Sequence, residues 1–318
     1  MIARAVDAIL EFSIVGSFTR IGYHARRRLL RWQPLADLRI DGRTAIVTGA
    51  TAGLGLETAT TLARLGAAVC IVGRDPGRTE RARETIATAT GATVEAEVAD
   101  LSLLRDARRF AESYALRHDR LDVLVHNAGA LLHDRIETDE GHESTVATQV
   151  LAPFLITTLL RDRLVASPDA RVILVASGGA YSQPLDVAAL QMPEGYNGVT
   201  AYARCKRAQI ALAGEWARSF AGTDVTINAM HPGWVATKAI HDALPGFSRL
   251  IGPLLRTPAE GADTMVWLAA AAEHRSGRFF HDRAPRAAHR LRRTRRRDEA
   301  AEAARLFAWC MRTTATVG

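Results

Sequence analysis

A tyrosine and a lysine four positions apart are the residues of this sequence best suited to acid–base chemistry. They are Tyr202 and Lys206, in the run Tyr-Ala-Arg-Cys-Lys. Positions four apart share one face of a helix, so the ammonium would lie near the phenol. A nearby positive charge favours the phenolate and lowers the phenol pKa from its usual value of about 10. The pair could then give a proton to a carbonyl or take one from an alcohol.

The scarcity of lysine strengthens this interpretation. Only two of the 41 basic residues are lysines, and one of them stands four after a tyrosine. Ser177 follows a predicted strand, 171–176, whose last five residues are all apolar, as is typical of a buried strand. Its hydroxyl would hold the substrate oxygen beside Tyr202, because doubly wound folds build their sites at the carboxyl ends of strands. The alternative is an ordinary serine in a turn after the strand.

A glycine-rich stretch earlier in the chain predicts a phosphate-binding loop. The run Thr-Gly-Ala-Thr-Ala-Gly-Leu-Gly, 48–55, follows a predicted strand and opens a predicted helix. Its glycines would bring the backbone against a pyrophosphate, and the helix N-terminus would supply N–H donors. The expected cofactor contacts are Thr48, Gly49, Thr51, Ala52, Gly53, Leu54 and Gly55.

The end of the second predicted strand favours NADP(H) over NAD(H). NAD enzymes usually place a carboxylate here for the ribose hydroxyls, whereas this chain has Arg74. A guanidinium can bind a 2′-phosphate with two parallel hydrogen bonds. Asp75 would instead cap the next helix, and Arg78 could add a second charge. The alternative is that Arg74 faces solvent and both cofactors bind.

From residue 42 onward, short apolar runs alternate with longer helical stretches. This alternation predicts an α/β fold with a doubly wound parallel sheet, a Rossmann fold, covered by helices on both faces. The seven expected strands are 44–48, 67–72, 93–98, 121–126, 171–176, 224–230 and 277–281. The expected helices are 54–65, 77–89, 102–117, 140–166, 200–220, 258–273 and 298–311.

Over residues 42–282 these motifs, in this order, resemble the short-chain dehydrogenases/reductases. Within that family, the stretches at 231–234, 261–269 and 276–283 resemble the member 12 branch. The resemblance implies hydride transfer and gives roles to further residues: Asp100 and Leu101 at the adenine, and Asn127, Ala128 and Gly129 below the cofactor. It also implies that Lys206 holds the nicotinamide ribose, and that the nicotinamide end is contacted by Tyr202, Pro232, Gly233, Trp234, Val235 and Thr237.

The sequence departs from the family pattern at two places. The family has a fourth catalytic residue, an asparagine that anchors a proton-relay water; here Gln149 stands in its context, which puts the relay in doubt. The gap from Ser177 to Tyr202 is also longer than usual, so we expect residues 180–198 to form a loop at the mouth of the site.

The two ends of the chain are predicted to be extensions of the main domain. Residues 1–41 carry an amphipathic helix, 2–29, that would pack on the enzyme or lie on anionic lipid. Residues 283–318 begin with eight arginines and no acid over 283–297, followed by a helix. We expect this tract to be solvated and dispensable for folding, with an acidic partner or anionic lipid as alternatives.

Composition excludes several classes of protein. The positive net charge of +7 comes from this tract, so nucleic-acid binding is not expected. Three scattered cysteines have no metal-binding spacing and fit a reducing cytoplasm. No apolar run is long enough to span a membrane, which predicts a cytoplasmic protein with membrane association left open. Whether it forms a homo-oligomer is also left open.

The substrate side is less defined. Apolar residues between 239 and 256 follow the Pro-Gly motif, where the resemblance places a substrate lid. They indicate a hydrophobic carbonyl or alcohol, or else ordinary core. The favoured function is an NADP(H)-dependent oxidoreductase, and the alternative is an NADP(H)-binding regulatory or scaffold protein with little turnover.

Overall fold

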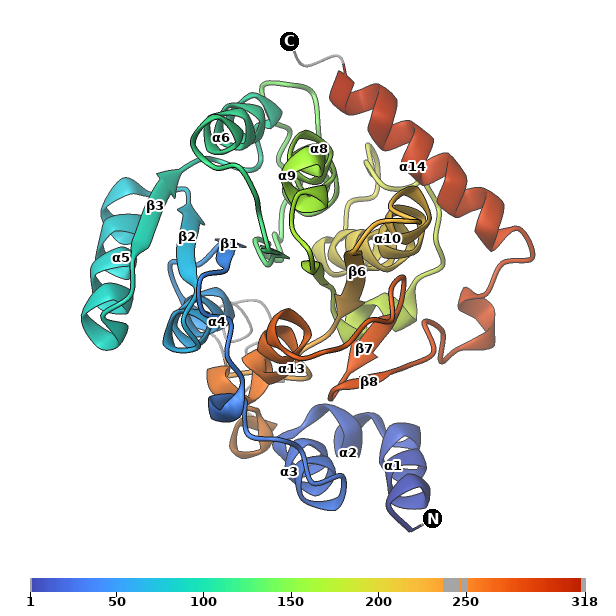
Figure 1. Ribbon diagram of the computed structural model, residues 1–318. Helices are drawn as coiled ribbons and strands as arrows, with labels where there is room; N and C mark the ends of the chain where they lie inside the picture. Colours follow the sequence, from blue (N-terminus) through green and yellow to red (C-terminus); the bar gives the residue numbers. More distant parts are fainter. Residues whose placement is uncertain (1, 237–245, 247–250, 316–318) are drawn as a thin grey trace.

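A computed structural model describes residues 2–236, 246 and 251–315. Its centre is an eight-stranded sheet with the order β3-β2-β1-β4-β5-β6-β7-β8 (Figure 1). All neighbouring strands are parallel except the last pair, β7 and β8. The strands are β1 (Thr44–Thr48), β2 (Ala68–Gly73), β3 (Val94–Val98), β4 (Val123–His126), β5 (Ala170–Val175), β6 (Val225–Met230), β7 (Phe279–His281) and β8 (Ala284–Pro285). The predicted fold class and all seven predicted strands are therefore confirmed.

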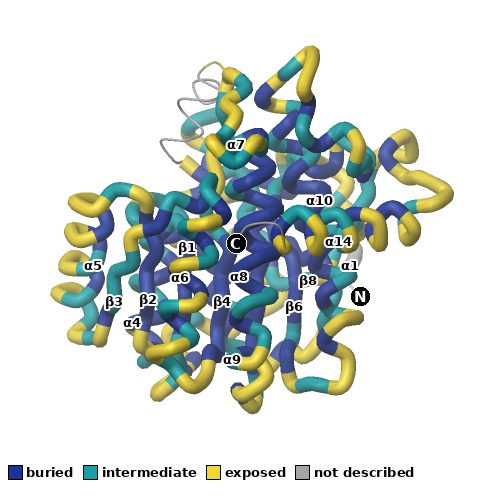
Figure 2. Tube along the Cα trace, turned by 90° about the horizontal axis from the view of Figure 1, so that it is seen from above, coloured by how far each residue is buried: buried dark blue, intermediate teal, exposed yellow. Residues whose placement is uncertain are grey.

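Helices cover both faces of the sheet, because side chains alternate between the faces along each strand. On one face Ile46 joins the core under α6 (Leu104–Arg117), α8 (Ala152–Leu159) and α10 (Gly198–Ser219). On the other face Val47 joins the core under α4 (Gly53–Arg64), α5 (Pro76–Thr90) and α13 (Pro258–Ala270). In Figure 2 the strands β2, β4 and β6 are mostly buried, whereas the helices, α5 above all, carry exposed segments.

The single helix expected at 140–166 is broken into four pieces. They are α7 (Ser144–Val146), a π-helical turn (Ala147–Leu151), α8, and α9 (Arg161–Val165). Pro153 gives the physical reason, because it has no N–H for the carbonyl four residues earlier and its ring crowds that carbonyl. The carbonyl released in this way belongs to Gln149.

The N-terminal extension forms three helices rather than one. They are α1 (Ile2–Phe12), α2 (Ile14–Phe18) and α3 (Arg20–Leu29). The Ser13 side chain accepts a hydrogen bond from the Gly16 N–H at 2.9 Å and starts α2. At Gly22 a Cβ atom would stand 2.2 Å from the Gly16 carbonyl oxygen, so only glycine lets the chain fold back here. Packing on the body, the favoured expectation, is confirmed by buried Phe18, Tyr23 and Arg26.

The C-terminal tract is the clearest failure of the sequence-based prediction. Arg286 binds Asp7 at 2.8 Å, Arg283 binds Asp263 at 2.6 Å, and Arg290 binds Glu11. The expectation of a solvated tract is therefore wrong for its first half, because distant acids neutralise these arginines, while its dispensability for folding stays a prediction. The remaining five arginines, at 292, 293, 295, 296 and 297, are exposed as expected, and Arg296 pairs with Asp186 at 2.7 Å.

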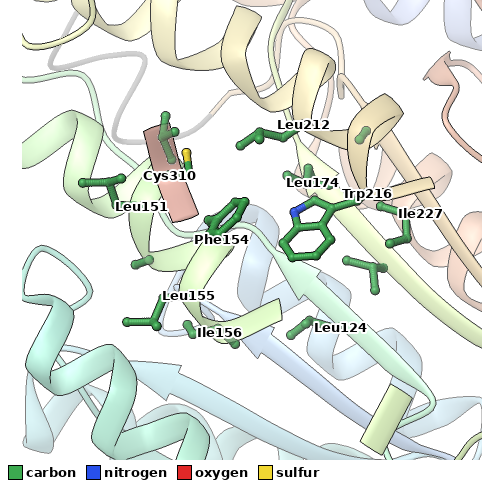
Figure 3. Close-up of a cluster of buried hydrophobic side chains, with 14 of the residues drawn as sticks. Leu124, Leu151, Phe154, Leu155, Ile156, Leu174, Leu212, Trp216, Ile227 and Cys310 are labelled. Carbon is green, nitrogen blue, oxygen red and sulfur yellow. The ribbon is translucent and has the colours of Figure 1, made fainter. Parts of the chain in front are cut away.

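The final helix, α14 (Glu299–Ala315), also belongs to the body. It lies along α10, and its Leu306 and Cys310 are fully buried in the main core. Figure 3 shows Cys310 beside Leu151 and Phe154. The three cysteines are free and buried. Within the described ranges, no helix is long and apolar enough to cross a membrane.

Candidate active site

A cleft of about 500 Å³ opens at the carboxyl ends of the central strands. Ser177, Tyr202 and Lys206 line it at one end, and Arg74 lines it at the other. Most of the predicted cofactor residues also lie on its wall, namely Gly49, Thr51, Ala52, Gly53, Leu54, Gly55, Asp100, Leu101, Asn127, Ala128, Gly129, Pro232, Gly233 and Val235. Thr237 lies outside the described residues.

The glycine loop has the conformation that the sequence indicated. Gly49 and Gly53 have φ of 66° and 56°, in the left-handed region that favours glycine. A Cβ atom at Gly55 would stand 2.4 Å from the Gly49 carbonyl oxygen. Helix α4 begins at Gly53 and has no side-chain cap, so its first N–H groups are available to a phosphate.

Thr48 supports this loop from behind instead of lining the cleft. Its Oγ1 accepts hydrogen bonds from the backbone N–H of Asn127 at 3.0 Å and of Ala128 at 3.1 Å. The Asn127 amide in turn donates to the carbonyls of Thr48 and Gly49. Thr48 thus supports the loop, and its direct contact with the cofactor stays a prediction.

The end of the cleft that would hold the adenosine ribose has an exposed guanidinium, that of Arg74, and a carboxylate that already accepts a hydrogen bond, that of Asp75. Arg74 makes no ion pair within the described part of the chain. Asp75 accepts the Arg78 N–H at 2.7 Å as the N-cap of α5, as expected. Both Arg74 and Arg78 line the cleft.

At the opposite end, Lys206 is held by hydrogen-bond acceptors rather than by a carboxylate. Its Nζ donates to the Val175 carbonyl at 2.7 Å and to Gln209 Oε1 at 3.1 Å. The same Nζ lies 5.2 Å from the centre of the Tyr202 ring. Ser177 Oγ accepts the Gly179 N–H at 3.2 Å, so Ser177 also has the turn role considered as its alternative.

Burial controls the pKa values of the catalytic pair. Burial of the phenol raises the pKa of Tyr202 to about 12, although a hydrogen bond with Ser177 opposes the rise. Burial likewise lowers the pKa of Lys206 to about 7. The Tyr202 pKa in the cofactor-free chain therefore lies above its ordinary value, opposite to the direction expected from a neighbouring lysine, because burial is the largest influence on it.

A second glutamine, which sequence reasoning missed, connects Gln149 to Lys206. Gln209 accepts from Lys206 through Oε1, and its Nε2 donates to the Gln149 carbonyl oxygen at 2.8 Å. This is the carbonyl that Pro153 leaves without an N–H partner. Gln209 follows Lys206 by three positions on α10, a spacing that could have revealed it.

The Gln149 side chain has a separate role on the cleft wall. Its Nε2 donates to the Ala130 carbonyl at 2.9 Å, and its buried Oε1 has no hydrogen-bond partner among the described residues. Its amide also packs on Gly129, where a Cβ atom would stand 2.9 Å from its Cδ. Gln149 thus braces the Asn-Ala-Gly segment, while its backbone oxygen faces the lysine network.

The N-terminal extension reaches the catalytic end of the cleft through Phe18. The backbone N–H of Trp234 donates to the Phe18 carbonyl at 2.8 Å, and the Trp234 ring contacts the Phe18 ring edge-on. Trp234 is not among the residues that line the cleft, and its assignment as a cofactor contact stays a prediction. A Cβ atom at Gly178, next to Ser177, would stand 2.5 Å from the Phe18 ring.

A buried ion network fixes this extension beneath the Pro-Gly motif. Arg26 and Arg256 both bind Asp282, at 2.7 and 2.6 Å, and all three side chains are buried. Arg256 also donates to the Pro232 carbonyl at 3.2 Å. Burial alone would raise the pKa of Asp282, but the two arginines hold it below its usual value.

The long segment between Ser177 and α10 does not form the mouth of the site. None of residues 180–198 lines the cleft. Tyr181, Leu185 and Leu190 are buried in the main core, and the Val187 N–H donates to Glu302 of α14 at 2.7 Å. That expectation is wrong, because the segment packs between α10 and α14. Most of the predicted lid, 239–256, lies outside the described residues.

Comparison with known proteins agrees with this geometry. The family model "short chain dehydrogenase" matches residues 43–245, which is more than half of the chain. The chain is a short-chain dehydrogenase/reductase. It is 38% identical to human dehydrogenase/reductase SDR family member 12 over 258 residues, covering 80% of each chain. It is 36% identical to mouse retinol dehydrogenase 14 over 262 residues, covering 76% of this chain and 78% of the relative.

Solved short-chain dehydrogenase/reductase structures show the same architecture. An Escherichia coli CFT073 short chain dehydrogenase, crystallised with NADPH, superposes with a TM-score of 0.65 at 26% identity. The match covers 79% of this chain and all of the other. Membership of this oxidoreductase family establishes a nicotinamide-cofactor fold and a small-molecule substrate for the chain.

Proposed function

We propose that this protein interconverts a carbonyl and an alcohol on a hydrophobic small molecule with NADP(H). The observation that carries the proposal is the convergence of Ser177, Tyr202 and Lys206 on the cleft that also contains the glycine loop. When bound, the nicotinamide would supply or accept the hydride. Tyr202 would give the proton to the carbonyl oxygen in reduction and take it back in oxidation.

Arg74 supports NADP(H) as the cofactor. It reaches the cleft without an ion-pair partner, while the neighbouring Asp75 carboxylate is engaged in capping α5. A free guanidinium beside an occupied carboxylate suits a 2′-phosphate better than a ribose diol. The uncapped N-terminus of α4 fits the pyrophosphate of either cofactor.

The catalytic end has the parts needed to hold a substrate oxygen. Ser177 would position that oxygen for Tyr202, and Lys206 would bind the nicotinamide ribose hydroxyls while favouring the phenolate. Leu132, Pro232 and Val235 give this end an apolar wall. Such a wall suits a hydrophobic substrate, and the relative named retinol dehydrogenase 14 is consistent with that class.

The decisive screen follows NADPH consumption with a panel of apolar aldehydes and ketones, including long-chain, retinoid-like and steroid-like members. We expect turnover with at least one carbonyl, and slower turnover when NADH replaces NADPH. The Tyr202→Phe protein, prepared identically, controls for contaminating reductases. Tight NADPH binding without turnover on any carbonyl would contradict the proposal and favour a regulatory NADP(H)-binding protein.

A further inference from the structure

The N-terminal helices expose a group of large apolar side chains. Five of them, here called the outer face, stand within 13 consecutive positions: Ile9, Phe12, Ile14, Val15 and Ile21. Phe12 is 92% and Ile9 is 70% exposed, one turn apart on α1. Single exposed apolar residues are ordinary, but such a group marks a surface that binds something.

The acids of helices α1 to α3 point away from the outer face. The first 36 residues contain only two acids, Asp7 and Glu11. Asp7 binds Arg26 at 2.7 Å and Arg286 at 2.8 Å, and Glu11 binds Arg26 at 2.9 Å. Both carboxylates are thus neutralised from the side of the protein body.

The charges that remain on the outside are positive. Arg27, Arg28 and Arg31 are exposed and make no ion pair within the described part of the chain. Arg28 lies two helical turns after Ile21, so apolar and basic side chains share the outward side of α3. Phe18, Tyr23 and Arg26 fix the opposite side to the body.

We propose that the outer face docks on an anionic lipid surface. Apolar side chains with flanking arginines and no free acid are the features of a helix that lies in the headgroup region. A second copy of the chain fits less well, because a two-fold interface would bring the same arginines against one another. In Figure 1, α1 to α3 form an arc outside the sheet, beyond β8 and α13, where a flat surface could reach them.

The test is co-sedimentation of the full chain with phosphatidylcholine vesicles, with and without one third phosphatidylglycerol. We expect binding to the anionic vesicles that weakens on neutral vesicles and at high salt. Phe12→Ser should lower the partition coefficient about tenfold or more, because the benzyl group no longer leaves water. Arg28→Glu should lower it by a similar factor.

Two matched variants control for composition. Leu116→Ser removes an apolar side chain that is 88% exposed on α6, and Arg64→Glu reverses an exposed arginine on α4. Both should bind vesicles within about twofold of the wild type. All four variants should keep the wild-type melting temperature, since the replaced side chains are exposed.

Three results would overturn the proposal. The first is absence of wild-type binding to anionic vesicles, and the second is equal loss in the control variants. The third is that the wild type does not bind vesicles but forms a dimer, and that Phe12→Ser dissociates this dimer. That result would assign the outer face to a second copy of the chain. None of these measurements involves turnover, so they are independent of the proposed reaction.

Discussion

The two ends of the cleft are built in different ways. At the cofactor end, backbone groups of the glycine loop and the Asn-Ala-Gly segment hold one another through Thr48 and Asn127. At the catalytic end, the Pro-Gly motif rests on Phe18, Arg26, Arg256 and Asp282, which come from the two extremes of the chain. The cofactor end is thus a local construction of the Rossmann sheet, whereas the catalytic end depends on contacts between residues up to 256 positions apart.

Replacing Asp282 by a neutral residue should cause the largest loss of stability at the catalytic end of the cleft. Asp282→Asn leaves Arg256 buried without an ion-pair partner among the described residues and removes one of the three carboxylates that bind Arg26, which should cost about 3–5 kcal/mol of unfolding free energy. Asp139→Asn removes an exposed partner of Arg105 and should cost less than about 1 kcal/mol. Urea denaturation of both variants measures the difference. Equal small losses would show that the N-terminal extension is not anchored by this network.

The buried lysine should make the cofactor-free protein more stable as the pH rises above 7. The pKa of Lys206 is about 7 in the folded chain and about 10.5 when unfolded, so the unfolded chain holds an extra proton between these values. The unfolding free energy should then rise by up to about 1.4 kcal/mol per pH unit from this group. Urea midpoints at pH 7.5 and 9 for wild type and Lys206→Met isolate the contribution. A variant with the wild-type pH dependence would show that the lysine stays charged.

Removing the free guanidinium should affect the cofactor end alone. Arg74→Ala should weaken NADPH binding by about ten- to a hundredfold, or ~1.5–3 kcal/mol, while NADH binding changes little. Fluorescence titration with both cofactors measures this selectivity. Two results would contradict the assignment of Arg74 to the 2′-phosphate. One is that the wild type binds NADH as tightly as NADPH, and the other is that Arg74→Ala keeps the wild-type affinity for NADPH.

Gln209 should act as a positioning residue for Lys206. Gln209→Leu removes one acceptor of the lysine and the partner of the Gln149 carbonyl, and should lower kcat by about five- to tenfold. Gln209→Glu should shift the pH profile of kcat/KM upward, because a nearby carboxylate raises the lysine pKa. Unchanged pH profiles in both variants would reduce Gln209 to a packing role.

The same contrast explains what the sequence could predict. The strands, the glycine loop, Tyr202 with Lys206, and Arg74 follow from spacing within short segments, where periodicity and backbone chemistry are informative. Phe18, Asp282 and the pairing of Arg286 with Asp7 depend on which distant segments meet, and no local pattern encodes that. The break in the helix at 147–151 is an intermediate case. Pro153 indicates that the helix is interrupted, but the π-helical turn depends on tertiary contacts.

The raised pKa of Tyr202 also could not be predicted from a local sequence pattern. Helical spacing indicates that Tyr202 and Lys206 are neighbours, but it does not indicate how far each is removed from water. In the structure Lys206 is almost fully buried and bound to the Val175 carbonyl, and burial is the largest influence on the pKa of both groups.

The central claim is that Tyr202 transfers the proton, and Tyr202→Phe tests it with the loss of one oxygen atom. With a carbonyl substrate found in the NADPH screen, steady-state turnover of Tyr202→Phe should fall by about 10²–10⁴-fold. NADPH affinity should stay within about twofold of the wild type, because the glycine loop and Arg74 are untouched. Turnover at the wild-type rate would contradict the account and remove Tyr202 from the reaction.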